Sequence, residues 1–161
     1  MKKVFALVLA VAMLMSVALA EIPSPPVFSV ISVDPDTVTV GVDADSETAK
    51  QLVTDIDAVG MDEAFGSVLD VPVEHTLVAL ADITMSGFED ADGQVTVKIF
   101  VPGVTSESDV KVLLGLLDAE VVNWEALEVV GVEDGIVTIV ITADQADAVQ
   151  AGSAVIAVLA K

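Results

Sequence analysis

An alternation of apolar side chains with polar or small ones is the feature that most limits how this chain can fold. Valine or isoleucine occupies every second position from 38 to 42 and from 95 to 101. The segment 75–85 shows the same period, with apolar residues at 77, 79, 81, 83 and 85. A period of two is typical of strands that bury one face. The sequence therefore predicts a mainly β protein.

Five further segments are rich in valine, isoleucine and leucine and are expected to form strands: 27–33, 110–116, 121–130, 136–142 and 154–159. The last two are apolar on both faces, which predicts central strands. The pairs Asp92-Gly93 and Asp134-Gly135 suit hairpin turns, because glycine accepts a positive φ and aspartate tolerates one. About eight strands are therefore expected.

One segment follows a helical period instead. In 46–59 the apolar residues recur at intervals of three and one, Asp45 or Ser46 can cap the start, and Gly60 suits the end. A shorter helical segment is expected at 143–150, where Thr142 and Gln145 match a capping box. One long helix among eight strands does not allow repeated βαβ units. The expected fold is an antiparallel β-sandwich with the 46–59 helix across one end or edge.

The N-terminus has the pattern of an export signal. Two lysines precede an apolar run from position 4 to 15, and Ala18-Leu19-Ala20 is a small-x-small cleavage site. The alternative is a membrane anchor, but the run is short and a proline-rich stretch follows it. We therefore expect a signal peptide at 1–20, a proline-rich lead at 21–26 and a single β-sandwich domain at 27–161. The mature protein is expected to be secreted or displayed at the cell surface, without a transmembrane segment.

Charge and composition exclude several classes of function. The chain has 26 acidic residues against 6 lysines and arginines, a net charge of −20, and no cysteine. A nucleic-acid binder needs a cationic face to displace counterions from phosphates, so no nucleic-acid partner is expected. Docking on anionic lipid is disfavoured for the same reason. Zinc fingers, disulfide frameworks and thiol chemistry all require cysteine.

The segment 92–140 carries turn and strand motifs in a recognisable order. They are Asp92-Gly93-Gln94-Val95-Thr96-Val97, Val101-Pro102-Gly103-Val104, Asn123-Trp124-Glu125-Ala126-Leu127 and Glu133-Asp134-Gly135-Ile136-Val137-Thr138. This order resembles a small immunoglobulin-like β-sandwich module of secreted and surface proteins from Gram-positive gut bacteria. The resemblance implies an antiparallel immunoglobulin-like sandwich in an extracellular setting, and it brings no catalytic residues with it.

Few residues point to catalysis. His75 is the only histidine, and no serine follows a nucleophile-elbow pattern, so His75 is interpreted as a structural or surface residue. Trp124 is interpreted as a core residue of its strand. The abundant carboxylates leave a small hydrolase as an alternative, because a glycosidase uses two of them. The scarcity of aromatic residues argues against a sugar cleft, so no catalytic residue is assigned.

The sharper candidate chemistry is calcium binding, because hard cations take oxygen ligands from loops. The segment 89–93 resembles part of an EF-hand loop, but aligning Gly93 on its sixth position puts Phe88 and Ile99 at the terminal ligand positions. Two interpretations are left: a calcium site formed by two loops together, and a solvated acidic surface that keeps the protein soluble. The candidate metal ligands are Asp34, Asp36, Asp43, Asp45, Glu89, Asp90 and Asp92. No other cofactor is expected.

These observations favour a non-enzymatic, exported module that binds or supports structures at the cell envelope. Its partner would be an envelope or surface protein or a glycan, held by loops or by an exposed strand edge. Two alternatives stay open. One is the carboxylate-dependent hydrolase, and the other is an assembly subunit that exchanges the 27–33 strand between copies.

Overall fold

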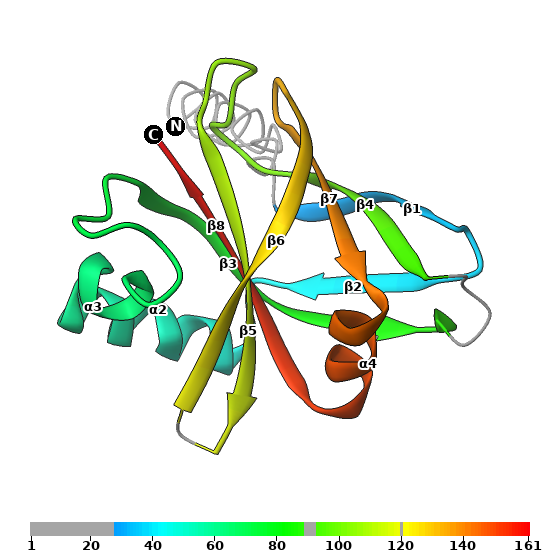
Figure 1. Cartoon of the computed structure of the whole chain (residues 1–161), viewed down its shortest axis with the longest axis horizontal. Coiled ribbons are helices and arrows are strands. Elements are labelled where there is room, and N and C mark those ends of the chain that lie inside the picture. The colour runs from blue at the N-terminus through cyan, green and yellow to red at the C-terminus, as the bar shows by residue number, and fades with distance from the viewer. Residues whose placement is uncertain (1–27, 89–92, 120) are drawn as a thin grey trace, which may run out of the picture.

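A computed structural model describes residues 28–88, 93–119 and 121–161, and its centre is one curled antiparallel sheet of eight strands (Figure 1). The strands are β1 (Ser29–Asp34), β2 (Thr39–Asp43), β3 (Thr76–Ser86), β4 (Gln94–Phe100), β5 (Val110–Asp118), β6 (Val121–Glu133), β7 (Ile136–Thr142) and β8 (Ser153–Ala160). Their order across the sheet is β1-β4-β7-β6-β5-β8-β3-β2. The predictions of a mainly β fold and of about eight antiparallel strands are confirmed.

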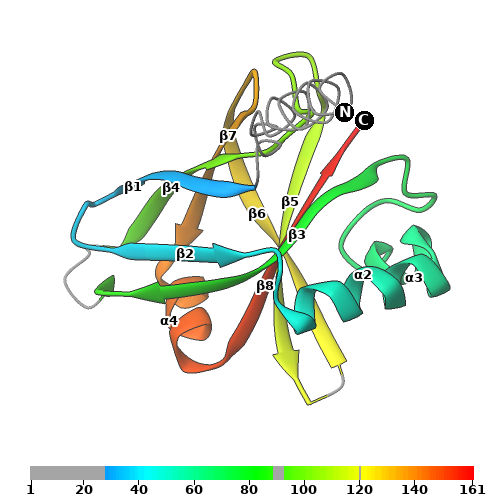
Figure 2. The ribbon, with the colours of Figure 1, turned by 180° about the vertical axis from the view of Figure 1, so that it is seen from behind.

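The sheet is nearly closed. Its two outermost strands, β1 and β2, contact each other and are joined by a tight turn in which the Val38 N–H donates to the Pro35 carbonyl at 3.1 Å. The long strand β6 joins the two halves, because 121–127 pairs with β5 and 128–133 pairs with β7. The predicted immunoglobulin-like sandwich, with two separate sheets, is therefore not confirmed. Figure 2 shows the same curled sheet from behind.

Inward-facing residues of all eight strands form the inner core. The alternation that predicted strands at 94–101 places Val95, Val97 and Ile99 there, each at most 1% exposed. Helix α4 (Ala143–Ala151) contributes Ala146 and Val149 and closes one end of the sheet. This helix and its capping box were both predicted from the sequence.

A smaller outer core lies on the convex face of the sheet, beneath α2 (Glu47–Val59) and α3 (Met61–Phe65). Phe65 is fully buried there and meets the ring of Trp124 edge-on, with 5.0 Å between ring centroids. The helix expected at 46–59 is confirmed, but it covers this face and not an end or edge. Helix α3 was not predicted.

Strand β8 lies between the two cores, and this position explains its sequence. Ile156 and Val158 face the inner core, while Ala157 and Leu159 face the outer core, so neither face meets water. The prediction of central strands from two-sided apolar character is confirmed for β8 and for β7, which lies between β4 and β6.

Strand β3 departs from the simple alternation expected of it. Its register against β8 shifts between Leu77 and Ala79, so that Leu77 packs in the outer core and Ala79 against the inner core. The sequence pattern placed both residues on one face. A bulge accounts for the difference, because one extra residue reverses which face the following side chains meet.

The expected signal peptide at 1–20 and proline-rich lead at 21–26 lie outside the described residues. Across the described ranges, no helix combines the length and apolar character needed to cross a membrane.

Candidate functional site

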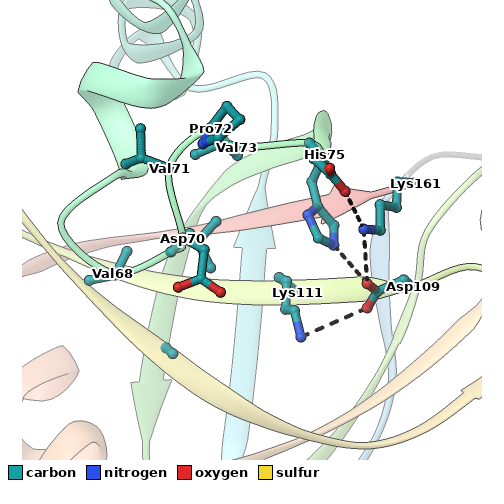
Figure 3. Close-up of a pocket in the computed structure, with 12 residues that line it drawn as sticks. Val68, Asp70, Val71, Pro72, Val73, His75, Asp109, Lys111 and Lys161 are labelled. Carbon is teal, nitrogen blue, oxygen red and sulfur yellow. Dashed lines mark hydrogen bonds and ion pairs between the residues drawn. The ribbon is translucent and has the colours of Figure 1, made fainter.

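A pocket of about 650 Å³ lies at the end of the sheet opposite α4 (Figure 3). Its floor comes from the outer face of β5 and β6, and its roof is the pocket loop, residues 66–75, which connects α3 to β3. The lining residues are Val68, Leu69, Asp70, Val71, Pro72, Val73, Glu74, His75, Asp109, Lys111, Ala126 and Lys161.

The sheet topology brings the charged residues of the pocket together. His75 precedes β3, Asp109 precedes β5, and Lys161 follows β8, which runs between those two strands. The backbones of Asp109 and Lys161 exchange two hydrogen bonds of 3.1 Å and so extend the β5–β8 ladder by one residue pair. Because neighbouring antiparallel strands run in opposite directions, two strand starts and one strand end meet at this edge.

Asp109 is the centre of the charged network. Its Oδ2 atom lies 3.2 Å from Nε2 of His75 and 3.9 Å from Nζ of Lys161, and its Oδ1 atom lies 3.8 Å from Nζ of Lys111. The two lysine contacts are longer than hydrogen bonds. The Lys111 and Lys161 ammonium groups therefore remain able to donate to a further acceptor in the pocket.

Glu74 and Lys161 form the tightest ion pair, in which the Lys161 ammonium donates to Oε2 of Glu74 at 2.7 Å. This hydrogen bond, reinforced by the lysine charge, lowers the pKa of Glu74 from its ordinary value. The same hydrogen bond and the Glu74 charge raise the pKa of Lys161. Both groups are therefore ionised at neutral pH.

The His75 side chain is nearly buried, with 11% of its surface exposed. Its Nε2 atom is shielded from solvent and, although close to Asp109, makes no aligned hydrogen bond with any described residue. A buried polar atom without such a bond costs free energy. His75 thus forms part of a pocket wall, a position that the sequence did not indicate.

The pocket loop supplies the apolar wall and is held in place by α3. The backbone N–H of Val73 donates to Oδ1 of Asp62, and the N–H groups of Val68 and Leu69 both donate to the Phe65 carbonyl. Val71 lies in this loop with 64% of its surface exposed. The short helix that sequence analysis missed therefore positions the roof of the pocket.

The four candidate calcium ligands among the described residues fall in two places. Asp34 ends β1 and Asp36 lies in the turn after it, whereas Asp43 ends β2 and Asp45 follows it, so the two pairs lie at opposite ends of β2. A strand of that length separates them by roughly 13 Å. All four side chains are exposed.

Two of these aspartates have local partners. Oδ1 of Asp43 accepts the N–H of Asp45, and the carboxylate of Asp45 pairs with Lys50 at 3.4 Å. Glu89, Asp90 and Asp92 lie outside the described residues. Within the described part of the chain, no three acidic or histidine side chains cluster as metal ligands. Calcium binding by these residues stays a prediction.

Sequence reasoning missed the pocket because its residues are far apart in the chain. The available signal was their position next to strand ends: His75, Asp109 and Lys161 each flank a segment expected to be a strand. Using that signal requires the strand order, which alternation does not provide.

Comparisons with family models, with curated proteins and with solved structures find no match to this chain. The resemblance of segment 92–140 to immunoglobulin-like modules therefore stays a prediction. The function has to be argued from the pocket itself.

Proposed function

We propose that this protein is an exported, non-enzymatic binding module of the cell envelope, and that the pocket is its binding site. The observation that carries the proposal is a pocket in which charges of both signs meet beside apolar side chains. Two of the 6 lysines, Lys111 and Lys161, line it together with the carboxylates of Asp70, Glu74 and Asp109. Convergent polar groups beside apolar walls are the usual composition of a ligand site.

The chemistry of the lining favours binding over catalysis. None of the twelve lining residues carries a hydroxyl or thiol that could act as a nucleophile. Glu74 is held ionised by Lys161, so it does not serve as a proton donor at neutral pH. Paired charges and an apolar wall can still orient a ligand.

The hydrolase remains a second candidate because one observation favours it. Glu74 and Asp109 both contact the Lys161 ammonium, at 2.7 and 3.9 Å, so the two carboxylates lie within the roughly 10 Å that a glycosidase pair spans. Turnover of an envelope glycan by the wild type, lost in Glu74→Gln, would replace the binding proposal with this one.

The proposal keeps two further expectations. Export rests on the 1–20 segment, and kinship with immunoglobulin-like modules rests on the 92–140 motifs and on the antiparallel, mainly β architecture. Strand exchange through 27–33 has weaker support: β1 is an outermost strand with Ile31 49% exposed, yet one of its edges pairs with β4 and it also contacts β2.

The test fills the pocket without disturbing the cores. Ala126 is exposed on β6 and lines the pocket, so Ala126→Trp is expected to occupy the space that a ligand needs. Val130, 53% exposed on the same strand but outside the pocket, gives the matched control Val130→Trp. Purified protein is titrated against envelope fragments of the organism that produces it.

We expect wild type and Val130→Trp to bind these fragments alike, and Ala126→Trp to bind at least tenfold more weakly. Equal binding by all three proteins would show that the fragments bind outside the pocket. Absence of binding by the wild type would remove the envelope-binding proposal.

A further inference from the structure

We propose that the pocket recognises a short zwitterionic peptide, through its free carboxylate, its free ammonium group and an apolar side chain. This inference rests on the proposed function and names the ligand class of the same site. Three features of the pocket carry it: two lysines with donors to spare, an aspartate on the roof above them, and apolar side chains on the same roof.

The free carboxylate of the peptide ligand is assigned to the floor of the pocket. Lys111 pairs across the ladder with Leu159 of β8, a residue of the outer core, so its side chain leaves the sheet on the pocket side. Its ammonium contacts only Asp109 among the described residues, at 3.8 Å. A ligand carboxylate can approach this ammonium to a charge-assisted hydrogen-bond distance without breaking a short bond.

Lys161 supports the same assignment. Its ammonium donates to Glu74 at 2.7 Å and lies 3.9 Å from the Asp109 carboxylate (Figure 3). An ammonium group carries three donors, so Lys161 can give one of them to a ligand carboxylate and keep its bond to Glu74. The Nε2 atom of His75 lies beside Asp109 but is shielded from solvent, so no ligand contact is assigned to it.

The free ammonium group of the peptide ligand is assigned to Asp70 of the pocket loop. Figure 3 shows its carboxylate pointing from the loop into the space above β5. This side chain is exposed, and none of the ion pairs among the described residues involves it. Asp70 and Lys111 therefore present opposite charges from the roof and the floor of one pocket.

Apolar side chains line the pocket beside these charges. Val68, Val71, Pro72 and Val73 line the roof, and Ala126 lies on the floor. A volume of about 650 Å³ falls within the range of pockets that hold small molecules, and it accommodates a peptide of a few residues.

The charge of the whole protein favours a zwitterion over an anion. At a net charge of −20, the protein repels anionic ligands before they reach the pocket. A zwitterionic peptide carries no net charge and avoids this repulsion. Its carboxylate gains the lysine contacts only at short range.

The test titrates the purified protein with leucyl-valine, with its C-terminal amide and with its N-acetyl derivative, followed by NMR chemical shifts. Physiological ionic strength screens the long-range field of the protein. We expect the zwitterion to bind about tenfold more tightly than either derivative, which is the effect of one lost charged contact of about 1.4 kcal/mol. Lys111→Met should abolish the preference over the amide, and Asp70→Asn the preference over the acetyl form.

Matched controls remove the same charges elsewhere. Lys98→Met on β4 and Asp57→Asn on α2 alter exposed residues outside the pocket, and both should retain the two preferences. Equal binding of the three compounds to the wild type, or loss of preference in the controls as well, would overturn the ligand class.

The two proposals fail separately. Pocket-dependent envelope binding without any response to leucyl-valine would leave the binding function in place and overturn the zwitterionic ligand. Zwitterion selectivity without pocket-dependent envelope binding would support the ligand class and overturn the envelope role.

Discussion

The two ends of the nearly closed sheet are built from different kinds of residue. At one end α4 inserts Ala146 and Val149 into the inner core, and its first turn is capped by Thr142 and Gln145. At the other end charged residues and an irregular loop surround a pocket. At the second end the Lys111 ammonium contacts only Asp109 among the described residues, at 3.8 Å, and so keeps donors available. The proposed binding site thus lies at the end of the sheet that no helix closes.

The largest expected effect comes from removing the apolar support of the pocket end. Phe65 is fully buried between α3 and Trp124, and its carbonyl anchors the pocket loop. Phe65→Ala should lower the free energy of unfolding by about 3–5 kcal/mol, measured by urea denaturation. Val71→Ala, at an exposed loop position, should change it by less than about 0.5 kcal/mol. Similar losses in both variants would show that the loop itself supports the fold.

The capped end should respond less strongly. In Thr142→Ala the Gln145 N–H loses its bond to the threonine hydroxyl, which should cost about 1 kcal/mol in the same denaturation experiment. Thr54→Ala on α2 removes an exposed hydroxyl that bonds only within its own helix, and its effect should stay below about 0.5 kcal/mol. Equal effects would indicate that the capping box contributes nothing specific to this end.

A smaller and more local effect is expected at the pocket loop. Asp62→Ala removes the acceptor for the Val73 N–H, so hydrogen exchange at that amide should accelerate at least tenfold. Asp62→Asn retains an acceptor oxygen and should largely preserve the protection. Unchanged exchange in both variants would mean that other contacts hold the loop.

The smallest effect concerns pH. The pKa of Glu74 is lowered in the folded protein, so the stability from its pair with Lys161 is present above its ordinary value of 4.5 and is lost as the pH falls below it. Because both side chains are well exposed, the contribution is small. The melting temperatures of wild type and Glu74→Gln should therefore differ slightly at pH 7, and the difference should shrink as the pH falls below 4.5. A constant difference across that range would contradict this pairing.

Much of the fold followed from local patterns in the sequence. Alternation located the strands, apolar character on both faces marked β7 and β8 as interior strands, and Thr142 with Gln145 indicated the start of α4. These features are local because side-chain period and capping depend on residues a few positions apart. The positive φ of Gly135 likewise agrees with the hairpin turn predicted at Asp134-Gly135.

The features that the sequence did not predict depend on contacts between distant segments. The bulge after Leu77 shifts the register of β3 against β8. The single curled sheet depends on β6, which pairs with β5 through residues 121–127 and with β7 through residues 128–133. The pocket forms where His75, Asp109 and Lys161 meet beside the ends of three strands. No local sequence pattern gives the order of those strands. The placement of α2 on the convex face similarly required knowing that Leu113 and Leu159 face outwards.

The central position of β8 has a consequence for the order in which the protein can be completed. This strand, residues 153–160, is the only described link between β3 and β5, so β2 and β3 have no ladder to the rest of the sheet until it is present. During synthesis from the N-terminus, the edges of β3 and β5 that β8 will occupy stay unpaired until residues 153–160 are available, and part of both cores stays exposed. The sheet therefore closes late, around a strand that also completes both cores, and the waiting chain is the state most exposed to aggregation.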